Sequence, residues 1–121
     1  MRRRALGGLS YHLSDMESVG AWAVFTIAGA IHSSANVASV TDNGTGDWTV
    51  NWAVQFGATT YAVAGCTRDQ TTGSIGTVLG ILETTAGETV SKSSVRVITG
   101  NSLGGRRDPS DGIYIVAIGR K

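Results

Sequence analysis

The sequence is poor in the residues that cross-link, stiffen or anchor a chain. Its 121 residues include one cysteine, one proline and two histidines. A single cysteine excludes a disulfide within the chain, which is consistent with folding in a reducing compartment. No apolar run approaches the roughly 20 residues that a membrane-spanning helix needs, so we expect no membrane span.

Strong charge of either sign is also missing. The formal net charge is +1, and only 16% of the residues are charged. A near-neutral domain has no field that would attract nucleic acid or an anionic membrane, and we expect neither as a partner. Two histidines and one cysteine make no convincing zinc set. We therefore expect no metal or other cofactor.

Glycine is what the sequence has in abundance. Its 17 glycines indicate many tight turns and close backbone approaches. The length suits a single domain. Residues 1–20 differ from the rest, because they hold a run of three arginines and a Gly-Gly pair, whereas strand-like segments alternate with turns further on. We therefore divide the chain into an N-terminal arm, residues 1–20, and a domain, residues 21–121.

The clearest strand lies in the middle of the chain. Residues 42–46 read Asp-Asn-Gly-Thr-Gly, which favours a turn because these residues tolerate positive φ or hydrogen-bond their own backbone. Apolar residues then recur at every second position: Trp48, Val50, Trp52, Val54 and Phe56. This period of two is typical of a strand with one buried face.

Six further segments have extended character, at residues 21–27, 31–41, 59–67, 76–83, 91–99 and 113–118. About seven strands at short and regular spacing predict an all-β fold. The fold class that we expect is an antiparallel β-sandwich with a short N-terminal arm.

The same residues resemble a small β-rich module of tailed bacteriophages, found in tail-fibre proteins and as short separate virion proteins. The module has an Ala-Trp opening, a core like SITDNGTGDYTVNF, a YAV strand and an apolar strand near its end. The matching positions here are Ala21-Trp22, residues 39–52, Tyr61-Ala62-Val63 and Val116-Ala117-Ile118. The resemblance spans roughly residues 21–120. Residues 22–26 lack the usual asparagine and glycine, and residues 67–92 match no part of the pattern.

The resemblance implies a structural, non-enzymatic virion protein, made in the host cytoplasm. The implied place is a tail fibre or tail tip, where a homotrimer would present loops to the host surface. A capsid decoration or head-fibre protein is the alternative within the virion. A carbohydrate-binding module is a further alternative, and an exposed aromatic platform would favour it.

Two segments are apolar on both faces, at residues 77–82 and 113–118. One face of an antiparallel sheet usually meets water, so such strands need a second cover, either a thick sandwich or another subunit. We expect an oligomer interface that includes Leu79, Ile81, Ile113 and Ile115.

Clusters of charge suggest two contact regions. The loop at residues 100–112 is the longest stretch without a strand pattern, and it contains Arg106, Arg107 and Asp108. We expect these three residues at an exposed tip, where they would suit an anionic or hydroxyl-rich ligand such as a host-surface glycan. A solvated Arg–Asp pair is the alternative. The arm would dock on other virion proteins through Arg2, Arg3 and Arg4, unless it is a solvated tail.

Enzymatic and metal-binding readings find little support in the sequence. Residues 42–47 have the oxygen density of a calcium loop but lack the EF-hand spacing and its distal glutamate. His32 stands beside two serines without a nucleophile-elbow motif. Glu83 and Glu88 flank a turn, as solubility charges commonly do. We therefore expect no enzyme.

Overall fold

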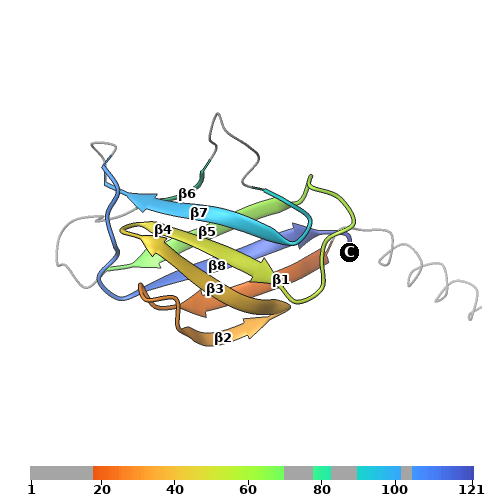
Figure 1. The fold of residues 1–121 in the computed structure, drawn as a ribbon, viewed down its shortest axis with the longest axis horizontal. Helices are drawn as coiled ribbons and strands as arrows, with labels where there is room; N and C mark the ends of the chain where they lie inside the picture. The colour runs from red at the N-terminus through yellow and green to blue at the C-terminus, as the bar shows by residue number, and fades with distance from the viewer. Residues whose placement is uncertain (1–17, 70–77, 83–89, 102–104) are drawn as a thin grey trace, which may run out of the picture.

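The structure, a computed structural model, describes residues 18–69, 78–82, 90–101 and 105–121. They form two antiparallel four-stranded sheets that pack together as a β-sandwich, which confirms the predicted fold class (Figure 1). None of the described segments is a helix of the length and apolarity that a bilayer crossing requires. Residues 1–17 of the predicted arm lie outside the description, and residues 18–20 belong to the first strand.

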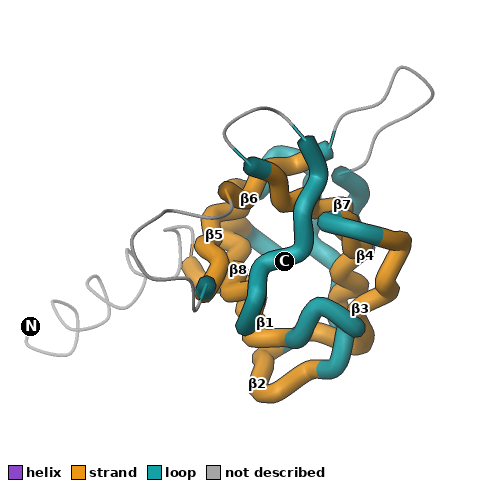
Figure 2. Tube along the Cα trace, turned by 90° about the vertical axis from the view of Figure 1, so that its left-hand side faces the viewer, coloured by secondary structure: helices purple, strands orange, loops and turns teal. Residues whose placement is uncertain are grey.

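The strands divide evenly between the two sheets. Sheet A has the order β2-β1-β8-β5 and sheet B the order β3-β4-β7-β6. Figure 2, an end-on view, shows sheet A along one side of the sandwich and sheet B along the other. The eight strands are β1 (Ser18–Phe25), β2 (Ile31–Ala35), β3 (Val37–Gly44), β4 (Asp47–Trp52), β5 (Ala62–Arg68), β6 (Val78–Ile81), β7 (Ser94–Gly100) and β8 (Gly112–Gly119).

Alternation along the central strands builds the core. On β4, the inward residues Trp48, Val50 and Trp52 are buried, as the sequence predicts. Val54 was expected on the same face, but it is 57% exposed because β4 ends at Trp52. The core from the other strands consists of Ala21, Ala23, Phe25, Val95, Val97, Ile113, Ile115 and Ala117, with Phe56 and Tyr61 from the connection after β4.

Aromatic side chains fill both ends of the space between the sheets. Trp48 packs edge-on against Phe25, and its indole N–H donates to the Ile27 carbonyl at 2.9 Å. Trp52 packs edge-on against Tyr61, whose hydroxyl accepts its indole N–H at 3.2 Å. Each buried tryptophan therefore joins sheet B to another segment and leaves no indole N–H unpaired.

The chain passes from sheet A to sheet B at Asn36, which divides the predicted segment 31–41 into β2 and β3. Asn36 has a φ of 56°, in the left-handed region. Its side-chain N–H groups donate to the carbonyls of Gly20 and Val54, both at 2.9 Å, and its side-chain oxygen Oδ1 accepts the Val54 N–H at 2.6 Å. Asparagine tolerates this φ better than most residues. One side chain thus joins β1 to the segment after β4.

Replacing Asn36 tests this corner. We expect Asn36→Ala to lower the free energy of unfolding by about 2–4 kcal/mol, because it adds backbone strain and removes three hydrogen bonds. Asn36→Gly relieves the strain and should cost less than Asn36→Ala. Urea titration of the two variants beside the wild type measures both effects. Wild-type stability of Asn36→Ala would contradict the assignment.

Candidate functional site

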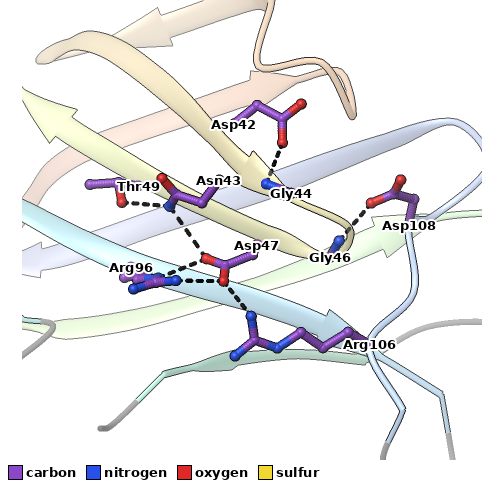
Figure 3. A network of polar contacts seen from close by, with 9 residues as sticks. All are labelled: Asp42, Asn43, Gly44, Gly46, Asp47, Thr49, Arg96, Arg106 and Asp108. Atoms are coloured by element: carbon purple, nitrogen blue, oxygen red, sulfur yellow. Dashed lines mark hydrogen bonds and ion pairs between the residues drawn. The ribbon is translucent and has the colours of Figure 1, made fainter. Parts of the chain in front are cut away.

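A buried carboxylate organises the end of sheet B beside the β3–β4 turn (Figure 3). Asp47, the first residue of β4, is only 2% exposed. Arg96 on β7 donates two parallel hydrogen bonds to it, from Nε to Oδ1 at 2.8 Å and from Nη2 to Oδ2 at 2.7 Å. Arg106 pairs with Oδ2, and the Asn43 amide donates to Oδ1 at 3.3 Å. Donors from three separate segments therefore converge on one carboxylate.

These donors fix the protonation state of the site. The hydrogen bonds from Arg96 lower the pKa of Asp47 below its ordinary value of 3.8, although burial acts in the opposite direction. Asp47 is therefore ionised at neutral pH, and strong donors occupy both of its oxygens. A carboxylate in this state holds structure together and has no free lone pair aimed at a ligand.

The neighbouring carboxylates are used in the same way. Asp42 accepts the N–H of Gly44 at 3.0 Å, and Asp108 accepts the N–H of Gly46 at 2.6 Å. The first bond lies within the turn. The second fastens the loop before β8, which contains Asp108, onto the turn. The turn is thus closed by its own side chains, which agrees with the Asx-type turn that the sequence favours.

The loop that leads from β7 to β8 is held along its described length. The Arg107 N–H donates to the Thr99 carbonyl at 3.1 Å, and the Thr99 hydroxyl donates to the Arg107 carbonyl. Towards β8, the Ser110 N–H donates to Asp69 Oδ1 at 2.7 Å. This loop therefore lies against the sandwich at both of its ends.

The three predicted tip residues separate into two kinds. Arg106 and Asp108 are engaged in bonds to Asp47 and Gly46, so the structure gives them an internal role. Arg107 is exposed, and its side chain forms no ion pair with any residue that the structure describes. Of the predicted cluster, Arg107 alone presents its charge to solvent unpaired.

Within the described ranges, no three histidine, cysteine, aspartate or glutamate side chains stand close enough together to hold a metal ion. Asp42 and Asp47 do not converge, since one caps the turn and the other faces two arginines. His32 is exposed on β2. Glu83, Glu88, Arg2, Arg3 and Arg4 lie outside the described residues.

The outer face of sheet B is polar. Paired positions across its strands carry hydroxyl, amide and guanidinium groups, as in the row Thr41, Thr49 and Arg96. The Asn51 amide donates to Ser39 at 3.0 Å and to Thr41 at 3.3 Å. This face is suited to water.

The outer face of sheet A is apolar. Trp22 pairs with Val116, and Val24 pairs with Tyr114, so these side chains project from the side opposite the core. Cys66 and Ala64 on β5 pair with Tyr114 and Val116 and continue the same face. A shallow hollow lined by Trp22, Ala23, Val24, Gly65, Cys66, Tyr114, Ile115 and Val116 lies across it. Contiguous apolar faces of this kind are common at the contact surfaces of proteins.

Two of the four predicted interface residues lie in the core instead of on the surface. Ile113 and Ile115 face inward and are 0% and 4% exposed, so they belong to the core of the single chain. Leu79 packs against the core from the edge strand β6, and Ile81 is 39% exposed at that edge. The sequence showed that β8 is apolar on both faces, but it did not show which face points outward.

The aromatic residues bear on the carbohydrate-binding alternative. Trp48 and Trp52 are 0% and 6% exposed, so neither offers a stacking platform. Trp22 is 37% exposed, but the hollow beside it is lined mainly by apolar side chains. Sugars need hydrogen-bonding groups next to the stacking ring, and this hollow provides few.

Comparison with known proteins identifies no relative: no family model, no curated protein and no solved structure matches the chain.

Two glycines of the turn form a matched pair for mutagenesis. Both have positive φ, +128° at Gly44 and +63° at Gly46. A Cβ on Gly44 would meet nothing within 4 Å, whereas one on Gly46 would lie 2.5 Å from the Thr99 carbonyl oxygen. We expect Gly44→Ala to cost about 1–2 kcal/mol of stability through strain, and Gly46→Ala about 3 kcal/mol or more. Thermal melts measure both, and equal costs would refute the close approach.

The Asp47 network predicts a pH dependence. Because the folded pKa lies below the unfolded one, ionised Asp47 stabilises the fold fully above about pH 4, and this contribution is lost as the pH falls through the folded pKa. We expect Asp47→Asn to cost about 2 kcal/mol at pH 7. The gap between wild type and variant should shrink on acidification. Urea titrations from pH 7 to pH 3 measure it, and a constant gap would contradict the assignment.

Proposed function

We propose that the protein is a structural, non-enzymatic component of a tailed-phage virion, located in a tail fibre or tail tip. It would be made in the host cytoplasm, self-associate as a trimer, as the resemblance to fibre modules implies, and join other virion proteins through its N-terminal arm. Two things support this proposal. One is the resemblance of residues 21–120 to the tail-fibre module, and the other is the all-β fold of the described residues, which agrees with a β-rich module.

The observation that carries the proposal is that the clustered acidic and basic side chains bind one another or the backbone. Four charged residues at one end of the sandwich, Asp47, Arg96, Arg106 and Asp108, are each engaged with another part of the chain. An active site leaves its acids, bases or nucleophiles open to a substrate. This end of the molecule instead uses them to make a loop and a turn rigid, as a structural module does.

The host-contacting role is assigned to Arg107. Its exposed charge stands next to two residues that fasten the loop, so it is presented from a fixed backbone. A rigid loop loses little conformational entropy when it binds, which favours contact with an anionic or hydroxyl-rich surface.

Two single substitutions separate presentation from support. We expect Arg107→Ala to keep wild-type stability and to reduce host adsorption of phage at least several-fold. Arg106→Ala is the matched control, because it removes a neighbouring positive charge but also an Asp47 partner, and we expect it to lower the melting temperature. Phage adsorption and thermal melts report the two effects. Unchanged adsorption by Arg107→Ala would remove the host-contacting role.

The place on the particle is tested directly. Antibody-gold labelling of purified phage should decorate the tail end, and label on the head would favour the capsid decoration alternative. A chain lacking residues 1–16 retains every strand from Ser18 onward. We expect it to fold, with a wild-type circular dichroism spectrum, and to be missing from particles by mass spectrometry. Normal incorporation would refute docking by the arm.

A further inference from the structure

We propose that the outer face of sheet A is the surface through which copies of this chain associate. The face is defined by six side chains: Trp22, Val24, Cys66, Tyr114, Val116 and Ile118. The occupant is a second copy of the chain, with its own sheet A turned inward. This inference deepens the self-association in the proposed function and rests on that part of it.

The register shows that these six side chains form one continuous surface. Val116 lies at its centre, paired with Trp22 on one side and with Ala64 on the other. Tyr114 is likewise flanked by Val24 and Cys66. The surface therefore crosses three neighbouring strands, β1, β8 and β5, without an interrupting charge.

Exposure and composition distinguish this face from the other side of the sandwich. Trp22 is 37% exposed and Ile118 is 36% exposed. On sheet B, the corresponding central positions carry Thr49, Asn51 and Arg96, which are joined to neighbours by hydrogen bonds or ion pairs. A sandwich whose two outer faces differ so strongly in polarity is suited to water on one side and to an apolar partner on the other.

Charge at this face lies at its rim and is paired. Arg68, at the end of β5, forms an ion pair with Asp111 at 2.7 Å. The hollow at the centre has no charged lining residue. An apolar centre with a polar rim is the usual anatomy of a protein interface. Since the face has no excess charge, two identical copies can meet without repulsion.

The size of the face also fits a second copy. Strands about 4.8 Å apart with a rise of about 3.3 Å per residue give the four strands of sheet A an area of roughly 450 Å² in plan. Two such faces in contact cover roughly 900 Å² in plan, and more in accessible surface because the side chains project from the sheet, so the contact is close to the size at which specific protein interfaces begin. A glycan would leave most of this area uncovered and would find few hydrogen-bonding groups at its centre.

Cys66 provides a reporter at the face. It is the only cysteine in the sequence, and it is exposed in the single chain. Because it lines the hollow beside Tyr114, a second copy seated there would cover it. Its reaction with a maleimide therefore reports on the proposed interface and on no other part of the chain.

The experiment uses the full chain at micromolar concentration, with light scattering for mass and a maleimide for Cys66. We expect a wild-type oligomer with protected Cys66. Val116→Glu should give a folded monomer in which Cys66 reacts at least tenfold faster. Thr41→Glu, on the outer face of sheet B, changes the net charge equally and should keep the wild-type oligomer.

Two results would overturn the inference: a wild-type monomer with freely reactive Cys66, or an oligomer that Val116→Glu leaves intact. If Val116→Glu does not fold, Trp22→Ala decides, since it removes apolar area without adding charge. It should raise the dissociation constant at least tenfold, and an unchanged constant refutes the interface. If antibody-gold labels no part of the virion, the proposed function fails. The oligomer and the Cys66 protection would be unaffected by that result, so the two failures are distinguishable.

Discussion

The buried carboxylate of Asp47 is the constraint on which one end of the molecule depends. A carboxylate that is 2% exposed must be neutralised by close donors, because burying an unpaired charge costs several kcal/mol. Arg96 fixes β7 against β4, Arg106 draws in the loop before β8, and Asn43 closes the turn. The β3–β4 turn, strand β7 and the loop before β8 are thereby held at one place.

This arrangement gives the charged residues of the loop before β8 a structural role. A cluster of arginine and aspartate at a long loop suggests a binding tip when only the sequence is considered. In the fold, Arg106 and Asp108 fasten the loop, and of these three residues only Arg107 has an exposed side chain without an ion pair or hydrogen bond to the rest of the described chain. Two of the three charged side chains therefore hold the loop in place. The charged surface available for recognition is smaller than the sequence suggests.

Periodicity made most strands and much of the core predictable. The alternation of Trp48, Val50 and Trp52 reports burial locally, and it was confirmed. Pairing is different, because the sequence does not state which strands are neighbours. The Asp47–Arg96 pair spans β4 and β7, so no local pattern revealed it. The corner at Asn36 was missed for a related reason, since its hydrogen bonds reach Gly20 and Val54 from a position that looks like ordinary strand.

The apolar strand β8 was only partly predictable from its sequence. Its sequence predicts cover on both faces but leaves open which residues meet the sheet B side. In the fold, Ile113, Ile115 and Ala117 face the core, and Tyr114, Val116 and Ile118 face outward. The tyrosine fits this assignment, because its hydroxyl needs a polar partner and Arg68 supplies one at the rim. We therefore still expect β8 to be covered on both faces. The face that awaits a cover is the one with Tyr114, Val116 and Ile118, not the one with the buried isoleucines.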